Sequence, residues 1–200
     1  MQNIFSSYLY RKVLDINLKP IHEHINQTQK KDKAGRILTN YGGWQSQSFT
    51  TPHNPMKPLF KSIDLMVEEV RDNLDCKYKL KLNAYWYSIN YFGSFNKPHC
   101  HVGNAWDALV SGVFYINSFP QSGNIIFKTP NSLTDLMYAD RVNSYNPYTS
   151  STFSIEPQEN LCAVFPSDLE HYVEPNLNKK MDGSSGERIS ISFDYGVSND

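Results

Sequence analysis

The chain has 200 residues, 40% of them hydrophobic and 20% charged, and this composition is typical of one soluble globular domain with a substantial core. Its formal net charge is −1, because 19 lysine and arginine residues stand against 20 acidic ones. Broad binding to nucleic acid depends on a surplus of lysine and arginine that displaces counterions from phosphates, so the charge argues against that function.

The first 78 residues are predicted to be an N-terminal segment that supports the rest of the domain. Prolines and glycines in residues 1–55 predict loops and short strands. Between about residues 56 and 75, apolar residues recur three or four positions apart, which predicts an amphipathic helix. These apolar residues are Leu59, Ile63, Met66, Val67 and Val70.

Residues 79–195 are predicted to form the core of the domain from short strands. Alternating runs rich in aromatic and β-branched residues occur at 79–92, 110–119, 123–129, 161–167 and 188–196. No helical pattern separates these runs, which predicts a mainly β (α+β) fold with an antiparallel jelly roll or barrel. Segments 129–152 and 175–187 are predicted loops, and the first is long enough to act as a lid over a site.

The cysteines and the N-terminus bear on the cellular compartment. The three cysteines are widely separated and form no C-x-x-C pair, which predicts reduced thiols. The N-terminus lacks the sustained apolar run of a signal peptide, and no segment approaches the length of a membrane span. We therefore expect a cytoplasmic protein without a membrane partner, while the oligomeric state leaves no mark on the sequence.

The stretch NKPHCHVGN contains a possible metal site. On an extended chain, side chains two residues apart point to the same face, so His99 and His101 present two imidazoles together. A third ligand must come from elsewhere, and the best candidate is His171, which follows an apolar strand. Imidazole binds iron, zinc, copper and nickel alike, so these ligands do not select the metal. A second H-x-H, His22 and His24, has no buried strand pattern beside it, and we do not expect it to bind metal.

Near the C-terminus, a strand with one apolar face carries an arginine. Arg188, Ser190 and Ser192 alternate with apolar residues, so they share the opposite face. An arginine inside a barrel is unfavourable unless it meets an anion, and its planar fork fits a carboxylate. The alternative is an arginine at a strand edge that reaches solvent or a surface acid.

In chain order, these features are H-x-H, the strand sequence GVFY, a histidine and R-x-S. The chain thereby resembles the Fe(II)/2-oxoglutarate-dependent oxygenases, specifically the prolyl 4-hydroxylase-like branch and a small phage and bacterial group with an H-x-H motif. The resemblance extends over about residues 40–195 and includes the sequence W-Q-S at Trp44, Gln45 and Ser46. It implies a double-stranded β-helix, or jelly-roll barrel, and a place in the host cytoplasm if a phage encodes the protein.

The resemblance also implies roles for individual residues. The implied iron ligands are His99, His101 and His171. Arg188 is implied to hold the distal carboxylate of 2-oxoglutarate, with Ser190 and Tyr115 beside it. Asn83 and Tyr91 are implied to line the pocket. The implied enzyme uses Fe(II), 2-oxoglutarate as cosubstrate and O2 to hydroxylate a C–H bond of a peptidyl (for example prolyl) or small-molecule substrate, and it releases succinate and CO2.

Residue 101 departs from the family pattern, which is H-x-D or H-x-E. Three explanations stay open: an iron site of three histidines, a site in which Asp107 supplies the carboxylate while His101 lies behind it, and a site that has lost its chemistry. We favour three histidines because His101 lies fourteen residues before Tyr115, as the aspartate does in prolyl hydroxylases.

Two rival functions are compatible with parts of the sequence. Cupin dioxygenases also use three histidines, and the sequence from Gly93 to His101 fits the cupin opening G-x5-H-x-H. However, the glutamate that cupins have shortly after this motif is absent, and a cupin has no particular role for Arg188. The second rival is a jelly-roll protein that binds a ligand or partner without catalysis.

Overall fold

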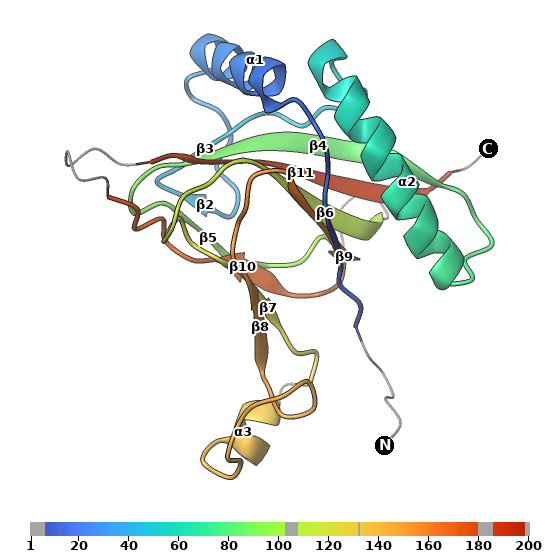
Figure 1. Cartoon of the computed structure of the whole chain (residues 1–200), viewed down its shortest axis with the longest axis vertical. Helices are drawn as coiled ribbons and strands as arrows, with labels where there is room; N and C mark the ends of the chain where they lie inside the picture. The colour runs from blue at the N-terminus through green and yellow to red at the C-terminus, as the bar shows by residue number, and fades with distance from the viewer. Residues whose placement is uncertain (1–6, 103–107, 132, 180–185, 199–200) are drawn as a thin grey trace.

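The computed structural model describes residues 7–102, 108–131, 133–179 and 186–198. Two antiparallel sheets face each other (Figure 1), with six strands in the order β1-β9-β6-β11-β4-β3 and five in the order β2-β5-β10-β7-β8. This arrangement is the mainly β jelly roll that the sequence predicts.

The strands vary widely in length. The larger sheet contains β1 (Tyr10–Val13), β3 (Trp44–Gln45), β4 (Leu80–Asn90), β6 (Ala108–Asn117), β9 (Leu161–Pro166) and β11 (Arg188–Val197). The smaller sheet contains β2 (Asn40–Tyr41), β5 (Phe95–His99), β7 (Ile125–Lys128), β8 (Thr152–Ile155) and β10 (His171–Val173). The five predicted runs correspond to β4, β6, β7, β9 and β11. The other strands have two to five residues, too few for a period of two to locate them in the sequence.

Two helices accompany the sheets, and the sequence predicted one of them. The helix predicted at about 56–75 is α2 (Lys57–Asn73), which follows a 3-10 turn, η1 (Asn54–Met56). The short strands predicted before residue 55 are present as β1, β2 and β3, but the prediction missed α1, which occupies Leu18–Lys31. Only Ile21 and Ile25 of α1 are buried, so its helical period is too sparse to recognise. Neither helix, nor any other helix in the described part of the chain, is long and apolar enough to cross a membrane.

Both helices pack on the outer face of the larger sheet (Figure 1). Because side chains alternate along a strand, Tyr85 and Tyr87 of β4 and Ile191 of β11 join the helices in one apolar core. The residues between them point into the space between the two sheets. There a second apolar cluster, which includes Val113 and Phe165, fills part of the interior. The rest of that interior is a cavity.

The segment predicted as a lid lies away from this cavity. Strands β7 and β8 continue into an arm that projects from the barrel and carries the short helix α3 (Thr134–Tyr138) (Figure 1). Among the described residues of segment 129–152, none lines the cavity. The structure therefore does not support a lid there, and residues 180–185 of the other predicted loop lie outside the described part.

Candidate functional site

The cavity between the two sheets has a volume of about 400 Å³. Its lining includes all six residues predicted to contact metal or cosubstrate: His99, His101, His171, Tyr115, Arg188 and Ser190. Asn83 and Tyr91, which were predicted to line the pocket, do not. The cavity-facing positions of β4 are the even-numbered ones from Ala84 to Asn90, so these two residues fall out of phase.

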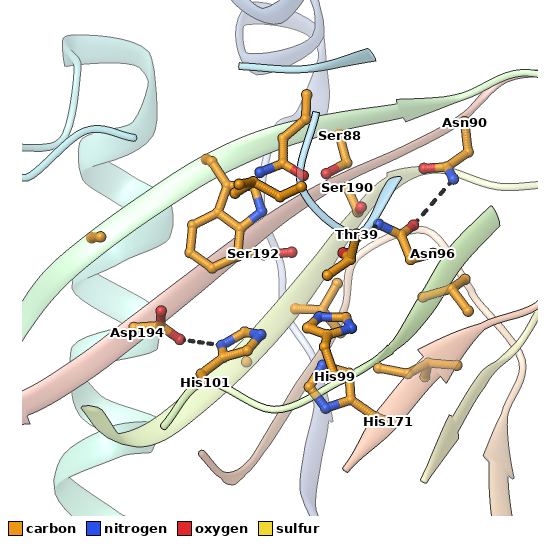
Figure 2. A pocket seen from close by; sticks show the side chains of 18 of the residues that line it. Thr39, Ser88, Asn90, Asn96, His99, His101, His171, Ser190, Ser192 and Asp194 are labelled. Atoms are coloured by element: carbon orange, nitrogen blue, oxygen red, sulfur yellow. Dashed lines mark hydrogen bonds and ion pairs between the residues drawn. The ribbon is translucent and has the colours of Figure 1, made fainter. Parts of the chain in front are cut away.

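Three histidines meet at one side of the cavity (Figure 2). His99 of β5 and His171 of β10 are direct cross-strand partners, which places their side chains side by side on one face. His101 lies just beyond the end of β5, where its backbone N–H donates to the carbonyl of Ser167 at 2.8 Å. One ring nitrogen from each histidine lies within 4.8 Å of the others. This spacing allows all three nitrogens to bind one metal ion.

The hydrogen bonds behind His99 and His171 determine which nitrogen faces the cavity. Nδ1 of His99 donates to the carbonyl of Lys97 at 2.7 Å, and Nδ1 of His171 donates to that of Leu169 at 2.8 Å. Since a carbonyl oxygen only accepts, each Nδ1 carries the hydrogen and each Nε2 keeps its lone pair. Burial lowers the pKa of His99, and it lowers that of His171 to about 3. Both rings are therefore neutral near pH 7, the form that binds a metal.

His101 has a different partner. Its Nδ1 lies 2.6 Å from Oδ1 of Asp194, a residue of β11 on the larger sheet (Figure 2). The hydroxyl of Ser111 donates to the same carboxylate oxygen at 2.7 Å, and it lies 2.8 Å from the hydroxyl of Ser167. The carboxylate thus receives the Nδ1 hydrogen and leaves Nε2 of His101 free for a ligand.

These residues fit a metal ion. Three imidazoles converge, and behind each one an acceptor takes the Nδ1 hydrogen. Such outer partners are what metal-binding histidines in proteins usually have. The alternative carboxylate ligand, Asp107, lies outside the described residues.

Arg188 lies elsewhere in the same cavity and is only 2% exposed. Its Nη1 donates to the carbonyls of Ser122 and Gly123, both at 2.8 Å. No carboxylate in the described parts of the chain forms an ion pair with it. Burial lowers the pKa of Arg188 to about 10, and it still carries its charge near pH 7. The alternative of a strand-edge arginine that reaches solvent or a surface acid is therefore wrong, and a buried cation lines the cavity without an anionic partner.

Gly123 makes room for this arginine. Its φ is +90°, in the region that favours glycine, and a Cβ there would lie 2.2 Å from the carbonyl oxygen of Glu174 and 2.9 Å from Nη1 of Arg188. No larger residue fits without displacing the backbone or the guanidinium. The turn that carries Gly123 therefore sets the position of Arg188.

Tyr115 and Ser190 are cross-strand partners on β6 and β11, and both are buried. Burial raises the pKa of Tyr115 to about 12, although the charge of Arg188 acts in the opposite direction. The phenol is therefore neutral at pH 7 and has a hydrogen to donate. A guanidinium, a phenol and a hydroxyl together suit a carboxylate.

A third part of the cavity is polar and was not predicted from the sequence as a surface. Its residues are Arg36, Thr39, Gln45, Ser48, Ser88, Asn90 and Asn96. Arg36 donates to the hydroxyl of Ser48 at 2.9 Å. Figure 2 shows the amide of Asn90 directed at that of Asn96, which in turn donates to Thr39. Most of these residues come from short strands and loops, where no periodic pattern could predict them. The sequence analysis named only Gln45, within W-Q-S.

Asp194, beside His101, is a residue of the site that was not predicted from the sequence. A signal was present, because Asp194 continues the alternation of Arg188, Ser190 and Ser192 along β11. All four line the cavity. Extending the polar face by two residues would have predicted an acid inside the barrel.

The family described as "Putative 2OG-Fe(II) oxygenase" matches residues 84–194, more than half of the chain. The chain belongs to this family. It is therefore an oxygenase that uses iron(II) and 2-oxoglutarate, and the cupin and the non-catalytic jelly roll are set aside. No curated protein matches the chain.

Solved structures of such oxygenases share the fold. A prolyl-4-hydroxylase from Pseudomonas putida has a TM-score of 0.65 and 15% identity, over 96% of this chain and 93% of that one. The viral collagen prolyl hydroxylase of Paramecium bursaria Chlorella virus-1, solved with 2-oxoglutarate, has a TM-score of 0.60 and 14% identity, over 94% and 95%. A prolyl hydroxylase from Trichoplax adhaerens, in complex with a peptide fragment of hypoxia inducible factor, has a TM-score of 0.63 and 14% identity, over 96% and 83%.

Proposed function

We propose that the three histidines of the cavity hold the iron(II) of this oxygenase and that Arg188 holds the distal carboxylate of 2-oxoglutarate. The observation that carries this proposal is the pairing of two sites in one cavity. Three imidazoles converge with their Nδ1 hydrogens turned away, and a buried guanidinium without an anionic partner shares the same cavity. One site suits a metal ion and the other a carboxylate.

When both are bound, iron(II) and 2-oxoglutarate supply the oxidation of a substrate C–H bond by O2, with release of succinate and CO2. The chain's own residues position these groups and keep the site dry. Tyr115 and Ser190 donate to the carboxylate beside Arg188. Apolar side chains around them, including Val113, Ile125 and Phe165, exclude water, which strengthens each of these interactions.

The polar part of the cavity supports a substrate rich in hydrogen-bonding groups. We infer a peptidyl or small-molecule substrate that brings an anionic or hydrogen-bonding group to Arg36 and Gln45. Arg36 forms no ion pair with any acid that the structure describes, so its charge is available to such a group. A cavity of about 400 Å³ that also holds 2-oxoglutarate accommodates one side chain or the reactive part of a small molecule.

Turnover of 2-oxoglutarate tests the cofactor assignment. Wild-type protein given Fe(II), 2-oxoglutarate and O2 is expected to release succinate slowly on its own and faster with a true substrate. Two probe sets, short peptides and polar carboxylates or phosphates, separate the substrate classes. Stimulation by apolar, uncharged compounds alone would contradict the role of the polar wall.

Metal binding tests the ligand set. We expect His101→Ala to lose Mn(II) binding in calorimetry, whereas Asp107→Ala retains it. If Asp107→Ala alone removes the metal, the three-histidine site is wrong. His22→Ala is the matched control, because His22 belongs to the other H-x-H pair of the chain, on α1.

A further inference from the structure

The three histidines do not have equivalent surroundings. His99 and His171 each donate to a neutral backbone carbonyl, whereas His101 lies against a carboxylate. His101 also occupies the position where the family pattern H-x-D or H-x-E places an acid. The negative charge missing from residue 101 therefore reappears one hydrogen bond farther from the metal, on Asp194.

We propose that Asp194 is a positioning residue that completes the metal site through His101. It turns Nε2 of His101 toward the other two imidazoles, and it supplies the negative charge that three neutral ligands lack. This inference rests on the proposed function, because it requires His101 to be a metal ligand.

The placement of Asp194 supports a dedicated role. The residue is 7% exposed, and it lies opposite Ser111 on β6, whose hydroxyl donates to it. Ser111 is fully buried and is itself held near Ser167, the residue whose carbonyl accepts the backbone N–H of His101. Contacts from three different segments thus hold the carboxylate and the imidazole together.

Among the described residues, Asp194 has no lysine or arginine within ion-pair distance as a partner for its charge. The imidazole of His101 beside it is neutral when Nε2 is free for a ligand. A buried carboxylate is unfavourable without a nearby positive charge. A divalent cation on Nε2 of His101 provides that charge across the imidazole ring. A carboxylate in this position also makes the imidazole a stronger ligand, an effect on metal affinity of about 10- to 100-fold.

The test is a double-mutant cycle with Mn(II) as the probe and calorimetry as the readout. In the wild type, Asp194→Asn keeps the shape and one acceptor but removes the charge, and we expect a loss of Mn(II) affinity of about 10- to 100-fold. In a His101→Asp background the carboxylate already binds the metal, and Asp194 faces a like charge. There we expect Asp194→Asn to leave Mn(II) affinity unchanged or to raise it.

Each outcome has one meaning. If Asp194→Asn lowers Mn(II) affinity in the wild type but not in the His101→Asp background, the result supports the proposal that Asp194 acts on the metal through His101. Equal losses in both backgrounds indicate a merely structural role and overturn the proposal, as does unchanged affinity in the wild type. If wild-type protein binds no Mn(II), the proposed function itself fails.

Two further measurements protect the test against misfolding. The melting temperature of each variant shows whether it is folded. If His101→Asp does not fold, the visible spectrum of Co(II)-loaded protein replaces the double-mutant cycle. Asp194→Asn is expected to shift the absorption bands of the metal. Ser111→Ala, which keeps the charge of Asp194, is expected to shift them less. An unchanged Co(II) spectrum in Asp194→Asn would overturn the proposal.

Discussion

The cavity has a metal end, formed by the three histidines, and a carboxylate end, formed by Arg188 with Tyr115 and Ser190. Their hydrogen-bonding groups are oriented in opposite directions. At the metal end, lone pairs face inward and the hydrogens of the three rings point outward to acceptors. At the carboxylate end, donors face inward, and part of the guanidinium of Arg188 is occupied by two carbonyls behind it. At the metal end, the acceptors behind the rings leave the Nε2 lone pairs for a cation. At the carboxylate end, the charge of the guanidinium itself favours an anion, and the two carbonyls hold the guanidinium in place. Each end should also fail separately, and the following predictions test that.

Loss of a metal ligand has the largest expected effect. His99→Ala removes one of three Nε2 donors, so we expect Mn(II) affinity to fall by more than the roughly 100-fold attributed to outer partners, with 2-oxoglutarate turnover lost. Calorimetry measures the first and succinate release the second. His22→Ala controls for the loss of a histidine as such. Retained metal binding in His99→Ala would remove the metal end from its proposed place.

Loss of the buried cation comes next. Arg188→Met removes charge-assisted hydrogen bonds to the cosubstrate, and we expect the KM for 2-oxoglutarate to rise roughly 100-fold or more. Mn(II) affinity without cosubstrate should not change. The matched control is Arg36→Met, the same substitution in the same cavity, which should leave the KM for 2-oxoglutarate near the wild-type value. If both arginine variants raise that KM equally, the carboxylate end is misassigned.

The turn behind Arg188 is expected to have an intermediate effect. Gly123→Ala introduces a Cβ against Glu174 and the guanidinium, at a positive φ that alone costs about 1–2 kcal/mol. We expect a melting temperature several degrees lower, at about 2–4 °C for each kcal/mol, and a KM for 2-oxoglutarate about tenfold higher.

Gly93→Ala separates strain from displacement of the arginine. Gly93 also has a positive φ, +79°, but a Cβ there meets nothing within 4 Å. It should lower the melting temperature without changing the KM for 2-oxoglutarate. Equal changes in KM for both glycine variants would contradict the role of Gly123.

The smallest expected effect concerns one hydrogen bond. Tyr115→Phe removes the phenol hydrogen, and we expect 2-oxoglutarate affinity to fall about 3- to 10-fold. Tyr195→Phe is its control, because Tyr195 lies on the helix-facing side of β11, where its hydroxyl donates to Asp64 at 2.5 Å. That variant should alter stability and leave cosubstrate affinity unchanged, as measured by calorimetry with Mn(II) present.

Local periodicity predicted much of the fold and the side chains that share a face in the site, whereas the roles of those side chains, and Tyr115 itself, came from the resemblance to the oxygenases. Strands β4, β6 and β11 are ten or eleven residues long, enough for alternation to stand out, and α2 repeats its apolar residues every three or four positions. Helix α1 and the shortest strands escaped prediction because they bury too few residues to show a period. Their folding depends on the sheet and helices against which they pack.

The two H-x-H pairs show how backbone conformation changes the meaning of a motif. In a helix, two residues correspond to a rotation of about 200° around the axis, so side chains two apart point to nearly opposite sides. His22 and His24 on α1 therefore cannot share a ligand on one face. At the end of β5, the same spacing brings His99 and His101 to one side. Only the surrounding strand pattern distinguished the two pairs in the sequence.

The sequence by itself determined which side chains can contact a ligand. It showed that His99 and His101 share a face, and that one strand carries Arg188 and Ser190 on the same side. Periods of two and 3.6 residues depend only on local backbone geometry, so they can be read along the chain. The tertiary structure alone decided which residues hydrogen-bond to these side chains and hold them in place. Asp194 meets His101 across 93 positions of sequence, and the two carbonyls behind Arg188 come from a turn 65 and 66 positions away. Such contacts depend on the register between strands and on the packing of two sheets, which no local pattern records.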